Sequence, residues 1–167
     1  MGLFSKKDND DNIEMAAKHI SGLETMYQKN QDVYVMLDEN DKKVIFKNKI
    51  YKVFNKIPKG ITEKTINLSI DKINRIEIVS EKEIIEKGKS VGGRAVIGGL
   101  LLGPLGLLVG GMSGIGKNKT TKIKMFMVIN YNEDKVITLE LPLIPINSNK
   151  LTLAVREQLN LPNQISL

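Results

Sequence analysis

The chain lacks cysteine and tryptophan entirely and has one histidine, His19, among its 167 residues. Without cysteine it has neither a disulfide framework nor a thiol nucleophile, and one histidine cannot supply a multi-histidine metal site. These absences remove most nucleophilic and zinc-hydrolase chemistry. We therefore predict a protein that is not an enzyme, with no catalytic residue, no cofactor and no metal site. We expect His19 to be a packing or capping residue.

Aromatic residues are also scarce, at 5% of the chain. The 25 Lys and Arg residues outnumber the 19 Asp and Glu residues, which gives a net charge of +6. Such an excess suits anionic lipid, nucleic acid or solubility alone. The positive charge is scattered, and the few aromatic residues form no recognisable platform on which bases could stack. These features argue against a nucleic-acid partner.

The first residues, MGLFSKKDNDD, contain no apolar stretch long enough for a secretory signal peptide. Gly2 and Ser5 approach a myristoylation pattern, but Lys6 stands where that pattern needs a hydroxyl. We expect a disordered polar tail over residues 1–11, one domain over residues 12–160 and a second tail over residues 161–167. We also expect the protein to be cytoplasmic.

Alternating apolar and polar residues predict several antiparallel strands. Residues 32–38 and 42–48 are rich in β-branched and aromatic residues and predict a hairpin with its turn at residues 39–41. The stretches INLSI and RIEIV, at residues 66–70 and 75–79, predict half-buried strands. A second hairpin is predicted from the alternation over residues 123–131 and 137–141.

Helical spacing predicts a helix near each end of the chain. The first covers residues 12–27, ends near Gly22 and has these apolar residues at helical spacing: Ile13, Ala16, Ala17 and Ile20. The second follows Pro145, with Asn147 or Ser148 as its N-cap and this apolar stripe: Leu151, Val155 and Leu159. Strands in hairpins followed by one terminal helix predict the α+β class, as an antiparallel sandwich or barrel.

The segment GGLLLGPLGLLVGGMSGIGKNK, residues 98–119, combines closely spaced glycines with apolar residues. Its end, residues 111–118, matches a phosphate-binding loop except that Asn118 replaces the Ser or Thr that binds magnesium. Such a loop also needs a buried strand before it and a helix after it. Here an apolar run precedes it and a predicted strand follows, so the sequence argues against nucleotide hydrolysis.

Residues 95–116 form a run of 22 uncharged residues, long enough to span a bilayer as a helix. Eight of them are glycine and Pro104 interrupts the run, so a continuous helix is unfavourable. If the strands before residue 80 and after residue 122 pair in one sheet, both ends lie on the same side of a membrane. A helical hairpin broken at Gly103 and Pro104 leaves about ten residues, or roughly 15 Å, in each arm. Such an arm enters one leaflet without crossing the bilayer.

We predict that this hairpin packs closely through small residues. They recur every fourth position, and with Pro104 at the break they are the candidate packing residues: Ala95, Gly99 and Gly103 in the first arm, and Gly106, Gly110 and Gly114 in the second. Basic residues flank the run and are expected at the headgroups of an anionic membrane: Lys87, Lys89, Arg94, Lys117, Lys119, Lys122 and Lys124. The apolar side chains between them must be buried in lipid, in a partner or against the domain itself.

Several segments resemble bacterial pleckstrin-homology-like (PH-like) or GRAM-like domains, namely AKHISGL, INLSIDKINRIEIV and LTLAVREQLN. The run GRAVIGGLLLGPLGLLVGGMSGIGKNK is similar to the glycine-zipper insert of such domains in bacterial and phage proteins, which often end in a short helical SHOCT module. That module is missing here. The resemblance implies a PH-like barrel or sandwich, with the glycine-zipper hairpin inserted over residues 88–118. It implies a binding or scaffolding role without a catalytic residue.

Two functions therefore remain open. The favoured one is a membrane-associating or self-assembling protein that uses the hairpin at the inner face of the plasma membrane. Its partners would be the membrane surface or inner leaflet and further copies of the chain. The alternative is a soluble, phage-related interaction module whose hairpin is buried in a homo-oligomer or in an unknown protein partner.

Overall fold

The computed structural model describes residues 13–48, 64–88, 96–97, 100–102, 123–145 and 147–161, with the backbone alone at residues 85–88, 96–97, 100 and 101. The predicted tail over residues 1–11 lies outside this range, as does most of the second tail. The elements are, in chain order, β1 (Ile13–Ser21), β2 (Asp32–Asp38), β3 (Lys43–Asn48), β4 (Thr65–Ser69), the 3-10 turn η1 (Ile70–Lys72), β5 (Ile73–Ser80), α1 (Glu81–Gly88), β6 (Val96–Ile97), β7 (Leu100–Leu101), β8 (Met125–Tyr131), β9 (Lys135–Glu140) and α3 (Ser148–Gln158).

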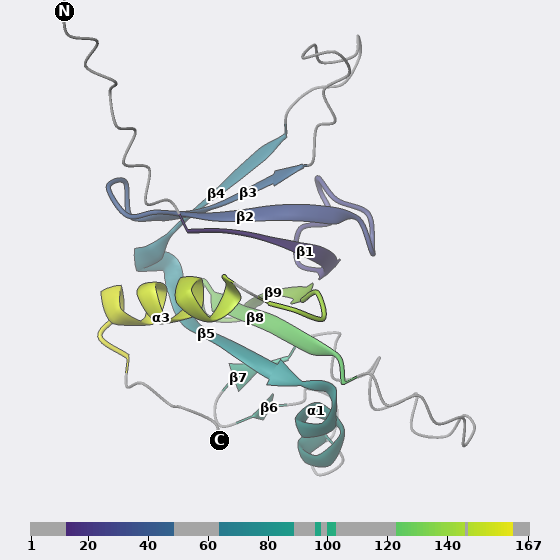
Figure 1. Cartoon of the computed structure of the whole chain (residues 1–167). Coiled ribbons are helices and arrows are strands. Elements are labelled where there is room, and N and C mark those ends of the chain that lie inside the picture. The colour runs from purple at the N-terminus through teal and green to yellow at the C-terminus, as the bar shows by residue number, and fades with distance from the viewer. Residues whose placement is uncertain are drawn as a thin grey trace, which may run out of the picture.

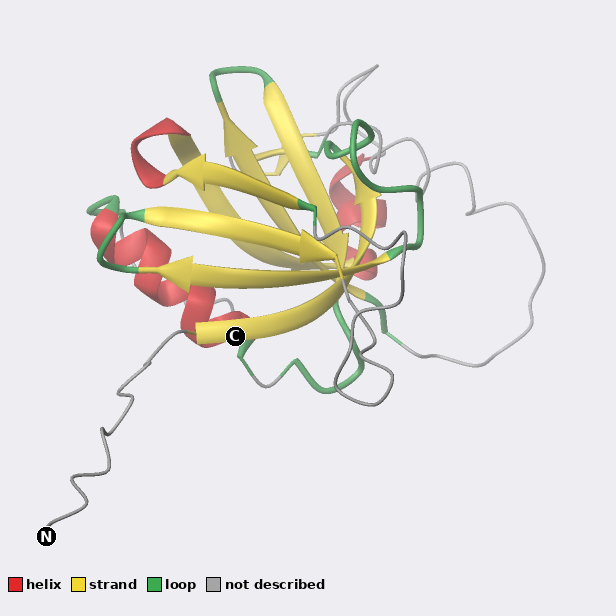
Figure 2. Cartoon of the chain, turned by 90° about the horizontal axis from the view of Figure 1, so that it is seen from above, coloured by secondary structure: helices red, strands yellow, loops and turns green. Residues whose placement is uncertain are grey.

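Seven of the described strands form one large antiparallel sheet in two halves, and β6 and β7 form a separate two-stranded sheet (Figure 1). The order of the large sheet is β4-β3-β2-β1-β9-β8-β5, and η1 connects the two edge strands β4 and β5. In Figure 1, β1 to β4 lie above α3, and β5 and β8 lie below it. Seen from above, α3 and α1 lie on opposite sides of the sheet (Figure 2). The predicted α+β class, with an antiparallel sheet and a C-terminal helix, is confirmed.

Both predicted hairpins are present. β2 pairs with β3, and β8 pairs with β9, each pair antiparallel. In β2 every second residue is fully buried, as the alternation predicts: Val33, Val35 and Leu37. The turn between β8 and β9 places Asn132 and Glu133 at φ 44° and 65°. This is the left-handed region, in which asparagine is enriched several-fold among non-glycine residues.

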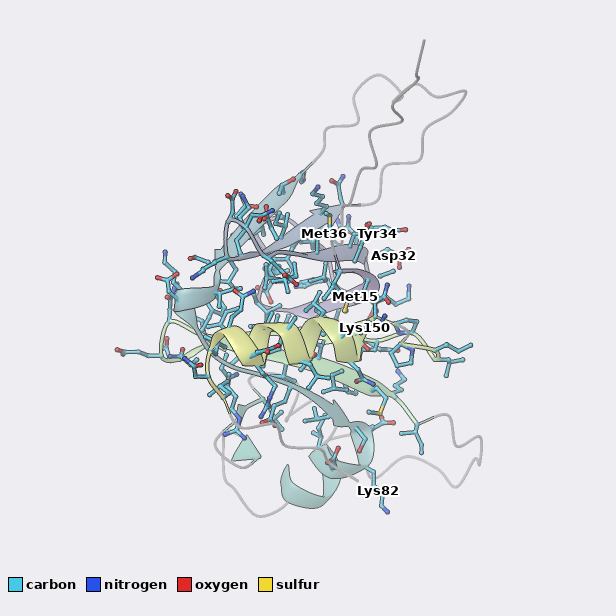
Figure 3. All side chains as sticks on the ribbon, turned by 60° about the vertical axis from the view of Figure 1, so that its left-hand side comes forward. Met15, Asp32, Tyr34, Met36, Lys82 and Lys150 are labelled. Atoms are coloured by element: carbon cyan, nitrogen blue, oxygen red, sulfur yellow. The ribbon has the colours of Figure 1, made fainter. Side chains whose placement is uncertain are left out.

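The C-terminal helix α3 closes the main core, as predicted. Leu151 and Val155 are fully buried in this core, to which all seven strands of the sheet contribute. The Asn147 side chain donates a hydrogen bond of 2.7 Å to the carbonyl oxygen of Glu14, which joins the start of the helix to β1. Figure 3 shows Met15 pointing toward α3, whereas Tyr34 and Met36 point away from it. The apolar stripe of the helix therefore serves as a lid on the core.

The helix predicted over residues 12–27 is wrong, because β1 occupies residues 13–21. This strand pairs with β2 on one side and with β9 on the other. Buried and exposed residues alternate along most of it: Met15, Ala17 and His19 are buried, and Glu14, Ala16 and Lys18 are exposed. The sequence carries this period of two alongside the helical spacing. Pairing with two neighbouring strands outweighs the local helical preference.

The connection after β1 depends on Gly22 and His19. Gly22 has a φ of +94°, and a Cβ atom there would lie 2.2 Å from the carbonyl oxygen of Val136, so only glycine fits. The buried His19 ring accepts a hydrogen bond from the N–H of Leu23 at Nε2, and its Nδ1 lies 3.1 Å from the carbonyl oxygen of Gln28. Because a carbonyl oxygen only accepts, Nδ1 carries the hydrogen. His19 is thus a structural link, in agreement with the packing role expected for it.

Candidate functional site

The insertion leaves and rejoins the sheet at neighbouring points of two paired strands. β5 and β8 pair antiparallel. Ser80, the residue before the insertion at 81–124, is paired with Met125, the residue after it. The backbone N–H of Glu81 donates to the carbonyl oxygen of Lys124 at 2.9 Å. The predicted condition that both ends of the insertion belong to one sheet is therefore confirmed. The two ends cannot move apart without breaking the pairing of β5 with β8.

The helix α1 starts at this point because Ser80 and Glu83 form a capping box. The N–H of Glu83 donates to the Ser80 hydroxyl at 3.2 Å, and the N–H of Ser80 donates to the Glu83 carboxylate at 2.7 Å. This exchange turns the chain from strand to helix and brings Ile84, which is fully buried, against the sheet. The Ser-x-x-Glu pattern at residues 80–83 is the sequence signal by which α1 could have been predicted.

A second, smaller core lies on the face of the sheet opposite to the main core. Alternate residues of β8 face opposite sides, so Met127 belongs to the main core and Phe126 to the second one. The buried members of the second core are Ile20, Val79, Ile84, Leu102, Phe126 and Val128. Leu102 is fully buried. Leu102 of the glycine-rich run therefore packs on its own domain.

Two short strands take the place of the start of the first predicted helical arm. β6 and β7 pair with each other antiparallel, and β7 lies against β8. The prediction of a helix is therefore wrong for residues 96–97 and 100–101. Extended backbone at these positions brings Leu102 onto the sheet, where burial of its side chain is favourable. The second predicted arm, over residues 105–116, lies outside the described residues.

Most of the predicted site residues also lie outside the part of the chain that the structure describes. They are the packing residues Ala95, Gly99, Gly103, Pro104, Gly106, Gly110 and Gly114 and the cationic residues Lys89, Arg94, Lys117, Lys119 and Lys122. Lys87 belongs to the last turn of α1, where the backbone alone is described. Lys124 is the one residue of the predicted set whose side chain is described.

Lys124 forms an ion pair with a carboxylate of β9. Its Nζ lies 3.5 Å from Oε2 of Glu140, and its side chain is 52% exposed. A second exposed pair joins Lys18 and Asp32 at 3.0 Å. Exposed pairs of this kind contribute little to stability. At this site each of the two lysine charges is balanced by a neighbouring carboxylate.

These four charged residues border a groove of about 280 Å³. The groove lies where β1 and β9 separate, since their pairing begins at Lys18↔Glu140. Its other lining residues come from β1, from the start of β8 and from the chain after β9: Ala16, Ala17, Ile123, Met125, Leu141, Pro142 and Leu143. Ile123 and Leu143 are 60% and 72% exposed, so the groove has an apolar rim that sequence reasoning did not predict.

Tyr27 is the most strongly perturbed titratable group in the described part of the chain. It is 2% exposed, its hydroxyl has no hydrogen-bond partner among the described residues, and burial raises its pKa to about 12. It belongs to the main core and does not line the groove. Within the described ranges, no group of three or more His, Asp or Glu residues is placed to hold a metal ion. None of the helices described has both the length and the apolar character needed to span a bilayer.

Most of the chain, including this insertion, matches a known protein family. The sequence model of a family described as "Glycine zipper containing PH domain" matches residues 24–142. The match covers most of the chain, from the connection after β1 to the residues after β9, and includes the glycine-rich insertion. No curated protein and no solved structure matches the chain.

Proposed function

The chain belongs to the family of glycine-zipper-containing PH domains, and from this premise we propose that it is a non-enzymatic interaction module. It associates with a membrane, or with further copies of itself, through the glycine-rich run at residues 95–116. In the membrane case it is a cytoplasmic protein, peripheral to the inner face of the plasma membrane. A PH-like domain with a glycine zipper fits an interaction role.

The observation that carries this proposal is the pairing of Ser80 with Met125. An odd number of membrane crossings between these residues would place β5 and β8 on opposite sides of the bilayer, which their hydrogen bonds forbid. An apolar run that enters a membrane from this sheet must therefore return on the same side, as a loop. Unpaired backbone groups are costly in lipid, so such a loop needs internal hydrogen bonding, as in a helical hairpin.

The closely packed part of the hairpin is proposed to begin after Leu102. Residues 96–97 and 100–101 are extended, and Leu102 is buried in the second core. The glycines that recur every fourth position beyond this point are Gly106, Gly110 and Gly114. Small residues at this spacing let two backbones approach closely in lipid or in an oligomer.

The flanking basic residues are proposed to lie at headgroup level. Near an anionic surface each contributes on the order of 1 kcal/mol of binding free energy. Lys124 contributes less than the others, because Glu140 already balances its charge. The electrostatic part of binding therefore depends on the lysines and Arg94 that precede Lys124 in the chain.

Vesicle flotation tests the membrane proposal. The wild type is compared with a variant in which a short Gly-Ser linker replaces residues 104–116, so that Leu102 and the second core stay intact. We expect the wild type to float with vesicles of phosphatidylcholine and phosphatidylglycerol and the variant to remain in solution. Equal flotation of the two proteins would exclude the run as the membrane contact. An unchanged circular dichroism spectrum of the sheet region serves as the folding control.

The burial of Leu102 favours a second candidate function. Since one side chain of the apolar run already packs on protein, the rest of the run can be buried in a homo-oligomer or in a protein partner. Light scattering in detergent-free buffer would then find a monodisperse oligomer that needs no lipid. Replacement of Gly106 and Gly110 by leucine should dissociate that oligomer. A wild type that is monomeric in buffer would exclude the homo-oligomer.

A further inference from the structure

We infer that the protein has a second membrane contact, the base patch, formed by Ile123, Leu143 and Ile144. The exposed fractions of these residues are 60%, 72% and 74%. Ile123 directly precedes β8, while Leu143 and Ile144 follow β9. Ile123 and Leu143 line the same groove, so residues distant in sequence meet on one surface. The inference rests on the proposed membrane association and extends it to residues of the domain itself.

The position of the base patch argues for a lipid surface as its partner. Residues 103–122, which lie outside the described part, run directly into Ile123, and residues 103–116 carry no charge. Between this uncharged run and Ile123 stand Lys117, Lys119 and Lys122, which are proposed to lie at headgroup level. When the run enters lipid, Ile123 follows these lysines at the membrane interface, and Leu143 on the same groove reaches that interface. Exposed side chains from two separate connections suit a fluid lipid surface, which adapts to their shape.

The charges around the patch indicate how it binds. The two lysines that border the groove are each paired with a carboxylate, Lys18 with Asp32 and Lys124 with Glu140. The rim therefore carries no net charge. Binding through the patch comes from burial of apolar surface, which salt screens little and which does not need anionic lipid. Pro145 restricts the backbone of Ile144, the residue before it, which lowers the entropy lost when Ile144 becomes ordered.

A single tryptophan can report on the patch, because the chain has none of its own. Leu143→Trp places the fluorophore in the patch, and Leu153→Trp places it on α3, where Leu153 is 48% exposed. On addition of vesicles of phosphatidylcholine and phosphatidylglycerol, the emission of Leu143→Trp should shift to shorter wavelength. Brominated lipid should then quench it. The emission of Leu153→Trp should stay unchanged.

Replacement of patch residues by glutamate tests how much the base patch contributes to the affinity of the protein for vesicles. Joint replacement by Leu143→Glu and Ile144→Glu should lower the vesicle partition coefficient about 10-fold or more. The loss should persist with vesicles of phosphatidylcholine alone, and Leu153→Glu should bind as the wild type does. A loss confined to anionic vesicles would overturn the apolar mode of binding.

The outcomes separate this inference from the function on which it rests. Flotation of the wild type together with unchanged emission from Leu143→Trp would overturn the base patch and leave the proposed membrane association standing. A wild type that does not float would exclude both. A shift in the emission of Leu143→Trp on concentration without vesicles would assign the patch to self-contact and overturn the lipid assignment.

Discussion

Arg156 reaches over the edge of β5 to Glu77, with its Nη1 3.3 Å from the Oε1 of that carboxylate. The same Nη1 lies 3.3 Å from the carbonyl oxygen of Ile76. Arg75 contacts the same Glu77 oxygen from within β5, at 2.6 Å. Since Ile76 faces the main core and Glu77 the opposite side, one guanidinium spans the edge of the sheet. The edge strand β5 is thereby tied to α3.

Replacement of Glu77 by glutamine should destabilise the fold by about 3 kcal/mol. The Arg156 side chain is 6% exposed and that of Glu77 is 15% exposed. Loss of the carboxylate charge therefore removes an anionic group from the side of a buried guanidinium. Urea unfolding of the wild type and Glu77→Gln measures the difference in the free energy of unfolding.

The exposed pair of Lys18 and Asp32 provides the matched control. Their side chains are 53% and 52% exposed. Asp32→Asn should therefore cost less than about 1 kcal/mol. Equal losses for Glu77→Gln and Asp32→Asn would contradict the buried role of the Arg156 contact.

Gly22→Ala should destabilise the protein by about 3 kcal/mol or more. The backbone at +94° is strained for any residue with a Cβ, and the added methyl group would meet the backbone of Val136 and Ile137. Asn30 also has a positive φ, of 66°, and Asn30→Gly should change the free energy of unfolding by less than about 0.5 kcal/mol. Thermal unfolding compares the two variants, and a Gly22→Ala protein as stable as the wild type would refute the close approach of this glycine to β9.

Leu102→Ala should lower the free energy of unfolding by about 2 to 5 kcal/mol, because it leaves a cavity in the second core. Leu153→Ala on α3 is the control, since that side chain is 48% exposed and its loss should cost about 1 kcal/mol or less. Chemical denaturation measures both. If Leu102→Ala is as stable as the wild type, the start of the glycine-rich run does not pack on the sheet.

Stability should fall at alkaline pH through Tyr27. Burial raises its pKa from 10.0 to about 12, so the native state holds the phenol proton in a range where the unfolded chain releases it. The raised pKa of Tyr27 contributes its full stabilisation below pH 10. This contribution, of order 2 kcal/mol in total, is lost as the pH rises to about 12.

Tyr27→Phe tests this dependence. The variant should unfold with a free energy within about 1 kcal/mol of the wild type at neutral pH, because the hydroxyl it loses has no partner among the described residues. Between pH 10 and 12 its stability should decline less steeply than that of the wild type. Urea unfolding across this range measures both curves, and parallel curves would exclude Tyr27 as the source.

The hairpins and α3 were predictable because their signals are local. Alternation in β2 is repeated in its buried residues, and the stripe of Leu151 and Val155 is the face that meets the core. The pairing of β5 with β8 could also be inferred, since both stretches have the pattern of strands in one antiparallel sheet. The base patch could not be predicted. The exposure of Leu143 and Ile144 depends on which neighbours cover them, and no local period encodes that.

By itself the sequence determined where the chain alternates, where it turns, and which uncharged glycine-rich run interrupts the sheet. The tertiary structure decided three further features: that residues 13–21 are a strand, that β8 is buried on both faces, and that Leu102 packs on the sheet. The physical reason is that backbone pairing and burial belong to contacts between distant segments. A stretch such as β1, whose sequence carries both a helical and a strand period, takes the conformation that its neighbours β2 and β9 complete.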